Sequence, residues 1–168
     1  MTQPARAASG ARLLGDDVQH LVVWYHALRT QRADSTIAEL AVEAAQAGNV
    51  DDLTLRRSAG PDEYWQIKAS VDATSPLTEE WLFRRPKGRS SLLGRLYASW
   101  ADLRRQDGQA PRVVLATTKA IDPGDVVLGP RATTDARIVE TLRNGTGALA
   151  VARERWADHL GAGPFQDR

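Results

Sequence analysis

The chain has 168 residues, of which 42% are hydrophobic and 26% are charged, and its formal net charge is +1. This length gives one core, and the near-neutral charge excludes binding to nucleic acid through an overall positive field. The absence of cysteine excludes disulfides, cysteine nucleophiles and thiolate metal sites, and no apolar stretch is long enough to cross a membrane. We expect a cytoplasmic protein without membrane contact, with an irregular tail at 1–9, one domain at 10–161, and a tail or linker at 162–168.

The first expected element is a helix over residues 16–29. Acids occupy its first turn, where they suit the helix dipole. Apolar residues recur at helical spacing and predict one core-facing stripe, made of Val18, Leu21, Val22, Tyr25 and Leu28. His20 and His26 lie off this stripe, so we place both on a solvated polar face.

Residues 36–47 support two interpretations. Thr36 and Glu39 form a capping box, and Gly48 suits a helix C-terminus, which together predict a short helix. The alternation of apolar residues with Glu39 and Glu43 predicts a strand instead. The local pattern alone leaves both interpretations open.

Two strands are predicted next, over residues 50–57 and 63–71, because apolar residues alternate in both. The connection between them contains Gly60-Pro61, a turn signal that favours an antiparallel pair. On the second strand Gln66 and Lys68 share one face, since side chains alternate along a strand.

The aspartates before the first of these strands differ in the face that they share. Asp51 has the parity of Leu53 and Leu55, which face the core, whereas Asp52 has the opposite parity. Because a buried carboxylate is costly unless it is paired, we expect Asp52 to be the acting acid. Asp51 is then a strand-end residue or a second ligand.

The remaining elements alternate between helices and strands. A turn of helix begins at Ser75, a second helix spans 90–107, and a buried strand spans 112–118. Residues 121–132 predict a loop in which 126–128 form a short strand, and two helices follow at 134–144 and 148–160. One dense basic loop precedes the second helix and carries Arg84, Arg85, Lys87 and Arg89. This loop is equally consistent with a phosphate-binding element and with a solvated connector.

The order of these residues resembles the restriction-endonuclease-like nuclease core, in which an acid precedes an (Asp/Glu/Gln)-x-Lys strand. The features are Gly15-Asp16-Asp17-Val18-Gln19, Glu43, Asp51-Asp52-Leu53, Gln66-Ile67-Lys68 and the strand that ends at Thr117. They are similar to the Gln-x-Lys branch, the N-terminal double-stranded-DNA endonuclease domain of bacterial antiphage effectors. The resemblance covers roughly residues 10–120. It implies an α/β fold with a central mixed sheet flanked by helices, and it favours a strand over about 36–44.

The resemblance also implies a metal-dependent endonuclease that cleaves double-stranded DNA with little sequence preference. Mg²⁺, with Mn²⁺ able to substitute, would be held by Glu43, Asp52, Gln66 and the carbonyl group of Ile67. Lys68 would orient the attacking water and offset developing charge, and Gln19 and Asp51 would lie behind the ligands. Proteins of this kind assemble into homo-oligomers when a sensor or ATPase region of a longer chain activates them.

Two other functions are consistent with the same residues. The first is a nuclease-like domain without catalysis that acts as a protein-interaction or assembly module. The second is a nuclease that acts on RNA. The position of Glu43, Asp52 and Lys68 relative to one another separates the first of these from an enzyme.

Overall fold

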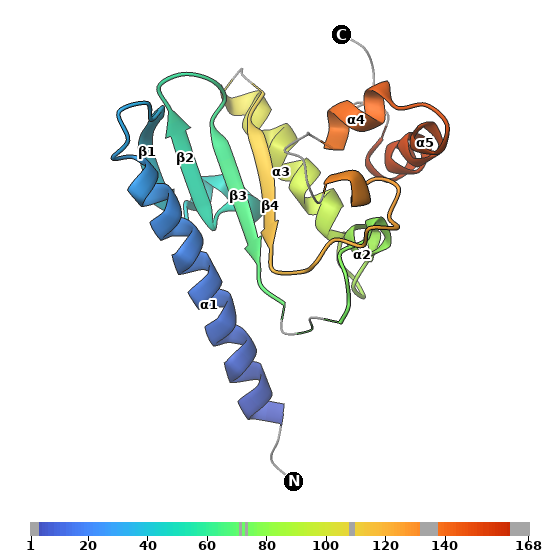
Figure 1. The fold of residues 1–168 in the computed structure, drawn as a ribbon, viewed down its shortest axis with the longest axis horizontal. Helices are drawn as coiled ribbons and strands as arrows, with labels where there is room; N and C mark the ends of the chain where they lie inside the picture. Colours follow the sequence, from blue (N-terminus) through green and yellow to red (C-terminus); the bar gives the residue numbers. More distant parts are fainter. Residues whose placement is uncertain (1–3, 71, 73, 108–109, 132–137, 162–168) are drawn as a thin grey trace. The chain divides into compact units, whose positions relative to one another are not determined.

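The computed structural model describes residues 4–70, 72, 74–107, 110–131 and 138–161 (Figure 1). The chain divides into two compact units, Met1–Ala73 with Ala98–Thr118, and Thr74–Tyr97 with Lys119–Arg168. The single domain that we expected over 10–161 therefore extends across two units. None of the described helices combines the length and the apolar character that crossing a membrane requires.

A four-stranded mixed sheet forms the centre of the first unit. Its strands lie in chain order and are β1 Ile37–Val42, β2 Leu53–Arg57, β3 Glu63–Lys68 and β4 Arg112–Thr117. The first three strands pair antiparallel, and β4 pairs parallel with β3. The strand prediction for 36–44 and the antiparallel pair after it are confirmed, although the strands are shorter than predicted.

The first helix, α1 Pro4–Arg29, crosses one face of this sheet (Figure 1). It begins far earlier than Asp16, so residues 4–9 are helical and not an irregular tail. Val18, Val22 and Val23 pack against the cluster of Leu53, Leu55 and Ile67. The predicted stripe is wrong in part, because Leu21, Tyr25 and Leu28 are exposed.

His26 belongs to the buried face of α1 and not to a solvated one. Its side chain is 2% exposed, and its ring meets the Trp65 ring edge-on at a centroid distance of 4.7 Å. Its Nδ1 atom is buried without a hydrogen-bond partner among the described residues. Burial lowers the pKa of His26, because the imidazolium loses its hydration, and the nearby Arg29 guanidinium lowers the pKa further.

The opposite face of the sheet is buried as well. Thr54, Tyr64 and Gln66 all have this orientation, and each is almost inaccessible to solvent. The 3₁₀ segment η1 Ala45–Val50 contacts β2 and β3, and Asn49 donates a backbone hydrogen bond to the Ser99 hydroxyl of α3 Leu92–Asp107. The side of the sheet opposite to Leu53 and Leu55 is therefore also buried in the middle of the strands.

The second unit contains α2 Glu79–Phe83, η2 Gly129–Arg131, α4 Ile138–Asn144 and α5 Ala148–Leu160. Helix α2 begins after Thr78, whose side chain caps it by accepting a hydrogen bond from the backbone nitrogen of Trp81. The prediction that this helix begins at Ser75 is therefore wrong. Residues 126–128 form a turn and not a strand, because Asp125 accepts backbone hydrogen bonds from Val127 and Leu128. Within 134–144, residues 134–137 lie outside the described part of the chain.

Replacing His26 by Leu should flatten the pH dependence of stability. The pKa of His26 in the folded chain lies below its usual 6.5, so the unfolded chain binds more protons as the pH falls through that value. The contribution of neutral His26 to the free energy of unfolding is thus fully present above pH 6.5. It is lost as the pH falls towards the pKa of His26 in the folded chain. We expect urea unfolding between pH 7 and pH 5 to show a shallower loss of free energy in His26→Leu than in wild type.

His20→Leu is the matched control, because His20 is an exposed histidine on the same helix. It should retain the wild-type slope. Burial also lowers the pKa of His159, so a residual slope should persist in His26→Leu. Identical slopes for His26→Leu and wild type would contradict the role that we assign to His26.

Candidate functional site

An acid, an amide and a backbone N–H meet where β2 begins and β3 approaches its end. The side-chain nitrogen of Gln66 donates a hydrogen bond to Asp52 Oδ2, and the backbone nitrogen of Ile67 donates to the same atom at 2.6 Å. The register explains this meeting, because Leu53 pairs with Trp65 and the next residues on each strand therefore lie together. The sequence parity of Asp52 and Gln66 correctly predicted that they share a face.

Lys68 is the last residue of β3 and follows Gln66 by two positions, so both side chains leave the same face of the strand. It is half-buried, and β4 places Thr117 beside it in the parallel register. Within the described residues, Lys68 forms no ion pair with Asp52. Lys68 therefore shares a strand face with Gln66 but is not bonded to the acid–amide pair.

Glu43 lies next to Asp52 in the backbone register but outside a strand. β1 ends at Val42, which pairs with Leu53, and the backbone nitrogen of Ala44 donates to the carbonyl group of Asp51 at 3.1 Å. Glu43 itself has a φ of 53°, in the left-handed region that non-glycine residues seldom adopt. Its side chain is exposed. Glu43 therefore lies at the same end of the sheet as Asp52, but its side chain is exposed to solvent in the turn after β1.

Gln19 and Asp51 are not joined to the acid–amide pair. Gln19 belongs to α1, which packs on the Leu53 and Ile67 side of the sheet, whereas Asp52 has the opposite parity. No hydrogen bond of the Asp51 side chain occurs in the part of the chain that the structure describes. Neither residue contributes to the geometry around Asp52.

The oxygen atoms at this edge suit a hard cation in their chemistry but are few. No group of three acidic or histidine side chains is close enough to hold a metal ion among the described residues. Two donors occupy Asp52 Oδ2, while no described residue donates to Oδ1. Gln66 directs its amide nitrogen to Asp52, so offering its oxygen requires the amide to turn over. A divalent cation bound here would keep several water molecules, because few protein oxygens are available to it.

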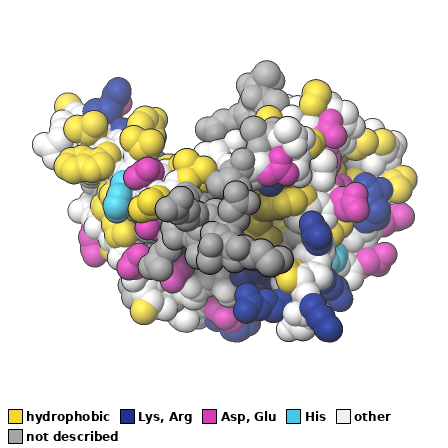
Figure 2. All heavy atoms as spheres, turned by 90° about the horizontal axis from the view of Figure 1, so that it is seen from below, with side chains coloured by type: hydrophobic (Ala, Val, Ile, Leu, Met, Phe, Trp, Pro, Cys, Tyr) yellow, Lys and Arg dark blue, Asp and Glu magenta, His cyan; other side chains and the backbone are white. Residues whose placement is uncertain are grey.

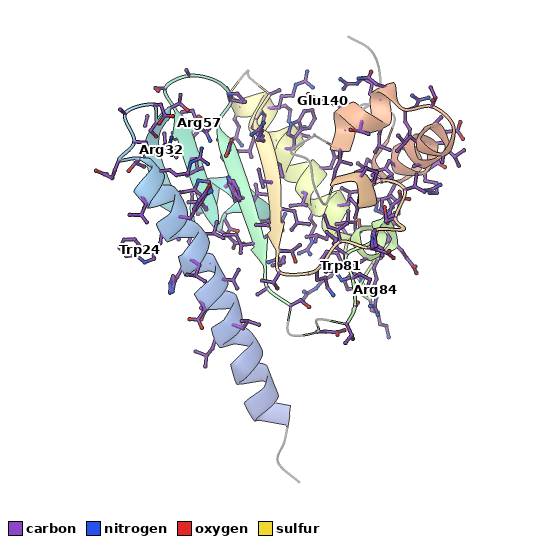
Figure 3. All side chains as sticks on the ribbon, in the orientation of Figure 1. Trp24, Arg32, Arg57, Trp81, Arg84 and Glu140 are labelled. Carbon is purple, nitrogen blue, oxygen red and sulfur yellow. The ribbon has the colours of Figure 1, made fainter. Side chains whose placement is uncertain are left out.

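The predicted basic loop is exposed and belongs to the second unit. Residues 84–90 follow α2 without regular structure, and Gly88 has a φ of 73° in a turn closed by the hydrogen bond from Arg89 to Pro86. All four basic side chains of the loop are exposed, and Arg84 is labelled in Figure 3. The loop can therefore present guanidinium and ammonium groups to an anion.

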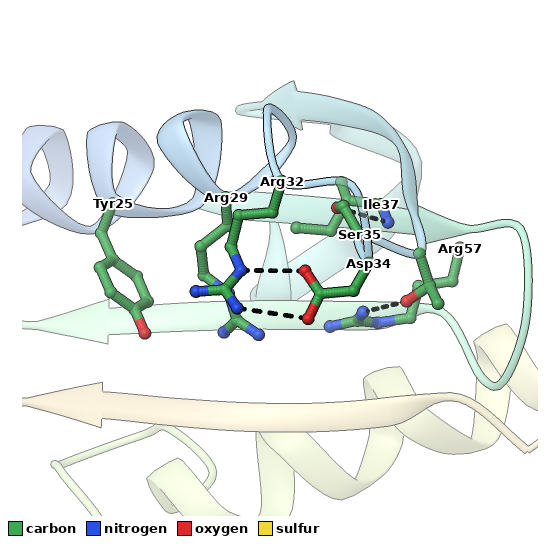
Figure 4. Close-up of a pocket in the computed structure, with 8 residues that line it drawn as sticks. Tyr25, Arg29, Arg32, Asp34, Ser35, Ile37 and Arg57 are labelled. Atoms are coloured by element: carbon green, nitrogen blue, oxygen red, sulfur yellow. Dashed lines mark hydrogen bonds and ion pairs between the residues drawn. The ribbon is translucent and has the colours of Figure 1, made fainter.

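A polar pocket of about 370 Å³ lies at the opposite end of β2 from Asp52 (Figure 4). Three arginines line it together with Asp34 and Thr36. Arg32 pairs with Asp34 at 3.0 Å, and Arg57 pairs with the buried Glu63 at 2.9 Å. Arg29 lies over the Tyr25 ring instead. Two of the three guanidinium groups are thus neutralised within the chain, and the pocket is separate from the acid–amide pair.

No family model matches this chain, and no curated protein is similar to it. The resemblance to antiphage endonuclease domains therefore rests on the residues themselves. The structure brings Asp52, Gln66 and Ile67 together, leaves Lys68 along the same strand face, and turns Glu43 outwards.

A serine–histidine contact in the second unit was not predicted from the sequence. The buried Ser91 hydroxyl lies 2.6 Å from His159 Nε2 and accepts a hydrogen bond from the backbone nitrogen of Gly94. Ser91 caps α3, and its hydroxyl shares a hydrogen bond with the imidazole of His159, whose pKa is lowered by burial and by Arg85. No local pattern signals the contact, since the two residues are far apart in the chain. The full use of Ser91 as a cap favours a structural role.

Replacing Asp52 by Ala should destabilise the first unit by about 1–3 kcal/mol, because the buried Gln66 amide and the Ile67 N–H would lose their acceptor. Asp51→Ala is the matched control, and we expect it to change the free energy of unfolding little. Urea unfolding followed by tryptophan fluorescence measures both variants. Equal stability of Asp52→Ala and Asp51→Ala would show that the contact contributes nothing.

Proposed function

We propose that the protein is a metal-dependent endonuclease that cleaves double-stranded DNA with little sequence preference, as the effector part of an antiphage defence system. The observation that supports this proposal is the Asp52 carboxylate held against Gln66 and Ile67, with Lys68 on the same strand face. The four-stranded mixed sheet with helices is also compatible with a restriction-endonuclease-like core.

The proposed residues have two roles, binding of the cation and positioning of the attacking water. Asp52 Oδ1, the Gln66 amide oxygen, the Ile67 carbonyl group and the Glu43 carboxylate would hold a divalent cation, which supplies charge stabilisation at the scissile phosphate when bound. If the Gln66 amide turns over to offer its oxygen, the hydrogen bond from the Ile67 nitrogen to Oδ2 would still hold the Asp52 carboxylate, and no described residue donates to Oδ1. Lys68 would orient the attacking water and offset the negative charge that develops on the phosphate.

The proposal also predicts how the cation is retained. Gln66 replaces an acid of the related pattern and carries no charge, so the site has one negative charge fewer. Because Glu43 is turned outwards, a phosphate group of DNA would complete the coordination. Mg²⁺ binding should accordingly be weak without DNA, and Mn²⁺ should replace it.

A second candidate function is an assembly module in which the nuclease-like edge is silent. The observation that favours it is that Asp52 is already engaged by two donors while Glu43 is directed to solvent. In this case the protein would bind a partner through an exposed surface. Replacing residues around Asp52 would then leave that binding unchanged.

Wild-type protein should cleave a supercoiled plasmid in Mg²⁺ or Mn²⁺ and not in EDTA. Lys68→Ala should reduce the rate by about 10²–10³-fold, because the developing charge would lose the cationic side chain that the proposal assigns to it. Gel analysis of nicked and linear products over time measures this rate, and labelled RNA in parallel reactions tests the alternative substrate.

Asp51→Ala is the control for cleavage, since its side chain makes no described contact with the pair. It should cleave at the wild-type rate. If Lys68→Ala and wild type behave alike at concentrations where the protein is assembled, the assembly-module function replaces the nuclease. Cleavage of RNA alone would change the proposed substrate.

Replacing the four basic residues of the loop by alanine should weaken DNA binding uniformly across sequences, since phosphate contacts position DNA without reading bases. Each lost contact should reduce the slope of log K against log salt by about 1. Fluorescence anisotropy with two unrelated duplexes at several salt concentrations measures both quantities. Arg105→Ala, an exposed arginine on α3, is the control, and a slope that the loop variant shares with wild type would remove the loop from the DNA path.

A further inference from the structure

Helix α1 has a second apolar face that nothing in the described part of the first unit covers. Its members are spaced at i, i+3, i+4 and i+7, so they form one stripe on the helix surface. They are exposed to an unusual degree for large apolar side chains: Leu21 69%, Trp24 66%, Tyr25 58% and Leu28 67%. Trp24 extends from α1 away from the sheet (Figure 3), and Figure 2 shows apolar surface on the side where α1 lies.

We propose that a second copy of this chain covers the stripe, with the two α1 helices antiparallel about a point between Trp24 and Tyr25. In this arrangement Leu21 of one copy faces Leu28 of the other, and Trp24 faces Tyr25. Every large member of the stripe therefore finds an apolar partner from the same set, as an isologous twofold interface requires. Tryptophan and tyrosine at the centre are residues that interfaces favour as anchors.

Charge along the helix selects the antiparallel direction. Asp16 and Asp17 lie before the stripe, and Arg29 and Arg32 lie near or beyond its end. The proposed pairing brings Asp17 of one copy to the C-terminal end of the other α1, where the turn that follows carries Arg32, twice by symmetry. Arg32 forms an ion pair with Asp34 of its own chain, but both side chains are largely exposed and such a pair contributes little energy. Arg32 can therefore also interact with Asp17 of the second copy.

A lipid surface fits the same helix less well. Helices that lie on membranes usually carry lysine and arginine along the polar face beside the apolar one. Helix α1 carries Asp16 and Asp17 close to the stripe, and its arginines Arg6, Arg12 and Arg29 all lie outside residues 13–28. The charge pattern thus matches a second α1 better than an anionic membrane. This inference is independent of the proposed nuclease activity.

Sedimentation velocity of the full chain should show a dimer that dissociates on dilution, and Leu21→Asp should raise the dissociation constant at least about 10-fold. Val151→Asp is the matched control, because Val151 is an exposed apolar residue on α5, at 55%. Circular dichroism checks that the variants remain folded. A wild-type monomer at all concentrations, or equal loss of dimer in Val151→Asp, would overturn the proposal.

A charge exchange tests the direction of pairing. Asp17→Arg and Arg32→Asp should each weaken the dimer, because each brings like charges together, and the double variant should recover most of the lost affinity. Failure of the double variant to recover affinity would rule out the antiparallel register.

The absence of cysteine allows a second test of direction. Tyr25→Cys should form an intermolecular disulfide under mild oxidation. Leu14→Cys should not, since the two copies of that residue would lie roughly 30 Å apart at 1.5 Å per residue. Equal cross-linking at both positions would indicate parallel helices, and binding of the monomer to anionic vesicles would indicate a lipid occupant; either result would overturn the proposal.

Discussion

The hydrogen bonds that Asp52 accepts from Gln66 and Ile67 hold together the end of the sheet at which β2 begins and β3 ends. They join the residue before β2 to the end of β3, beyond the last paired residues Leu53 and Trp65. A carboxylate in this position satisfies a buried amide and a backbone N–H at once, which fixes its orientation. The same contact serves stability and the proposed chemistry, and this is why substitution at Asp52 alone cannot separate the two roles.

Burial on both faces of the sheet limits where any chemistry can occur. α1 covers the side of Leu53 and Ile67, and Thr54 and Tyr64 on the other side are inaccessible as well. Solvent reaches the ends of β2 and β3, where the backbone register brings Glu43, Asp52 and Lys68 to one end of the sheet. The edge at the other end of β2 is different in character, because Glu63 there accepts from Trp65 and pairs with Arg57 and Arg112. That end is an internal ion-pair network, and it leaves the Asp52 edge as the better candidate for a cation.

Alternation predicted the strands because one buried face is enough to impose period two on a sequence. It gave the shared side of Asp52 and Gln66 correctly, but it did not reveal that this side is buried, since Thr54 and Gln66 are polar. Their burial depends on η1 and on contacts between residues distant in the chain, such as Asn49 with Ser99. The left-handed turn at Glu43 was likewise invisible, because glutamate carries no signal for a positive φ.

Helix α1 shows why periodicity fails when a helix has two apolar faces. The predicted stripe mixed residues of the two faces. Val18 and Val22 pack on the sheet together with the buried His26, whereas Leu21, Tyr25 and Leu28 are exposed and add nothing to the described core. A helix face that stays in contact with water would be expected to carry charged residues, because they favour solubility and are compatible with a helix. Retaining Leu21, Trp24 and Leu28 there is consistent with a requirement for association and not with the stability of the monomer.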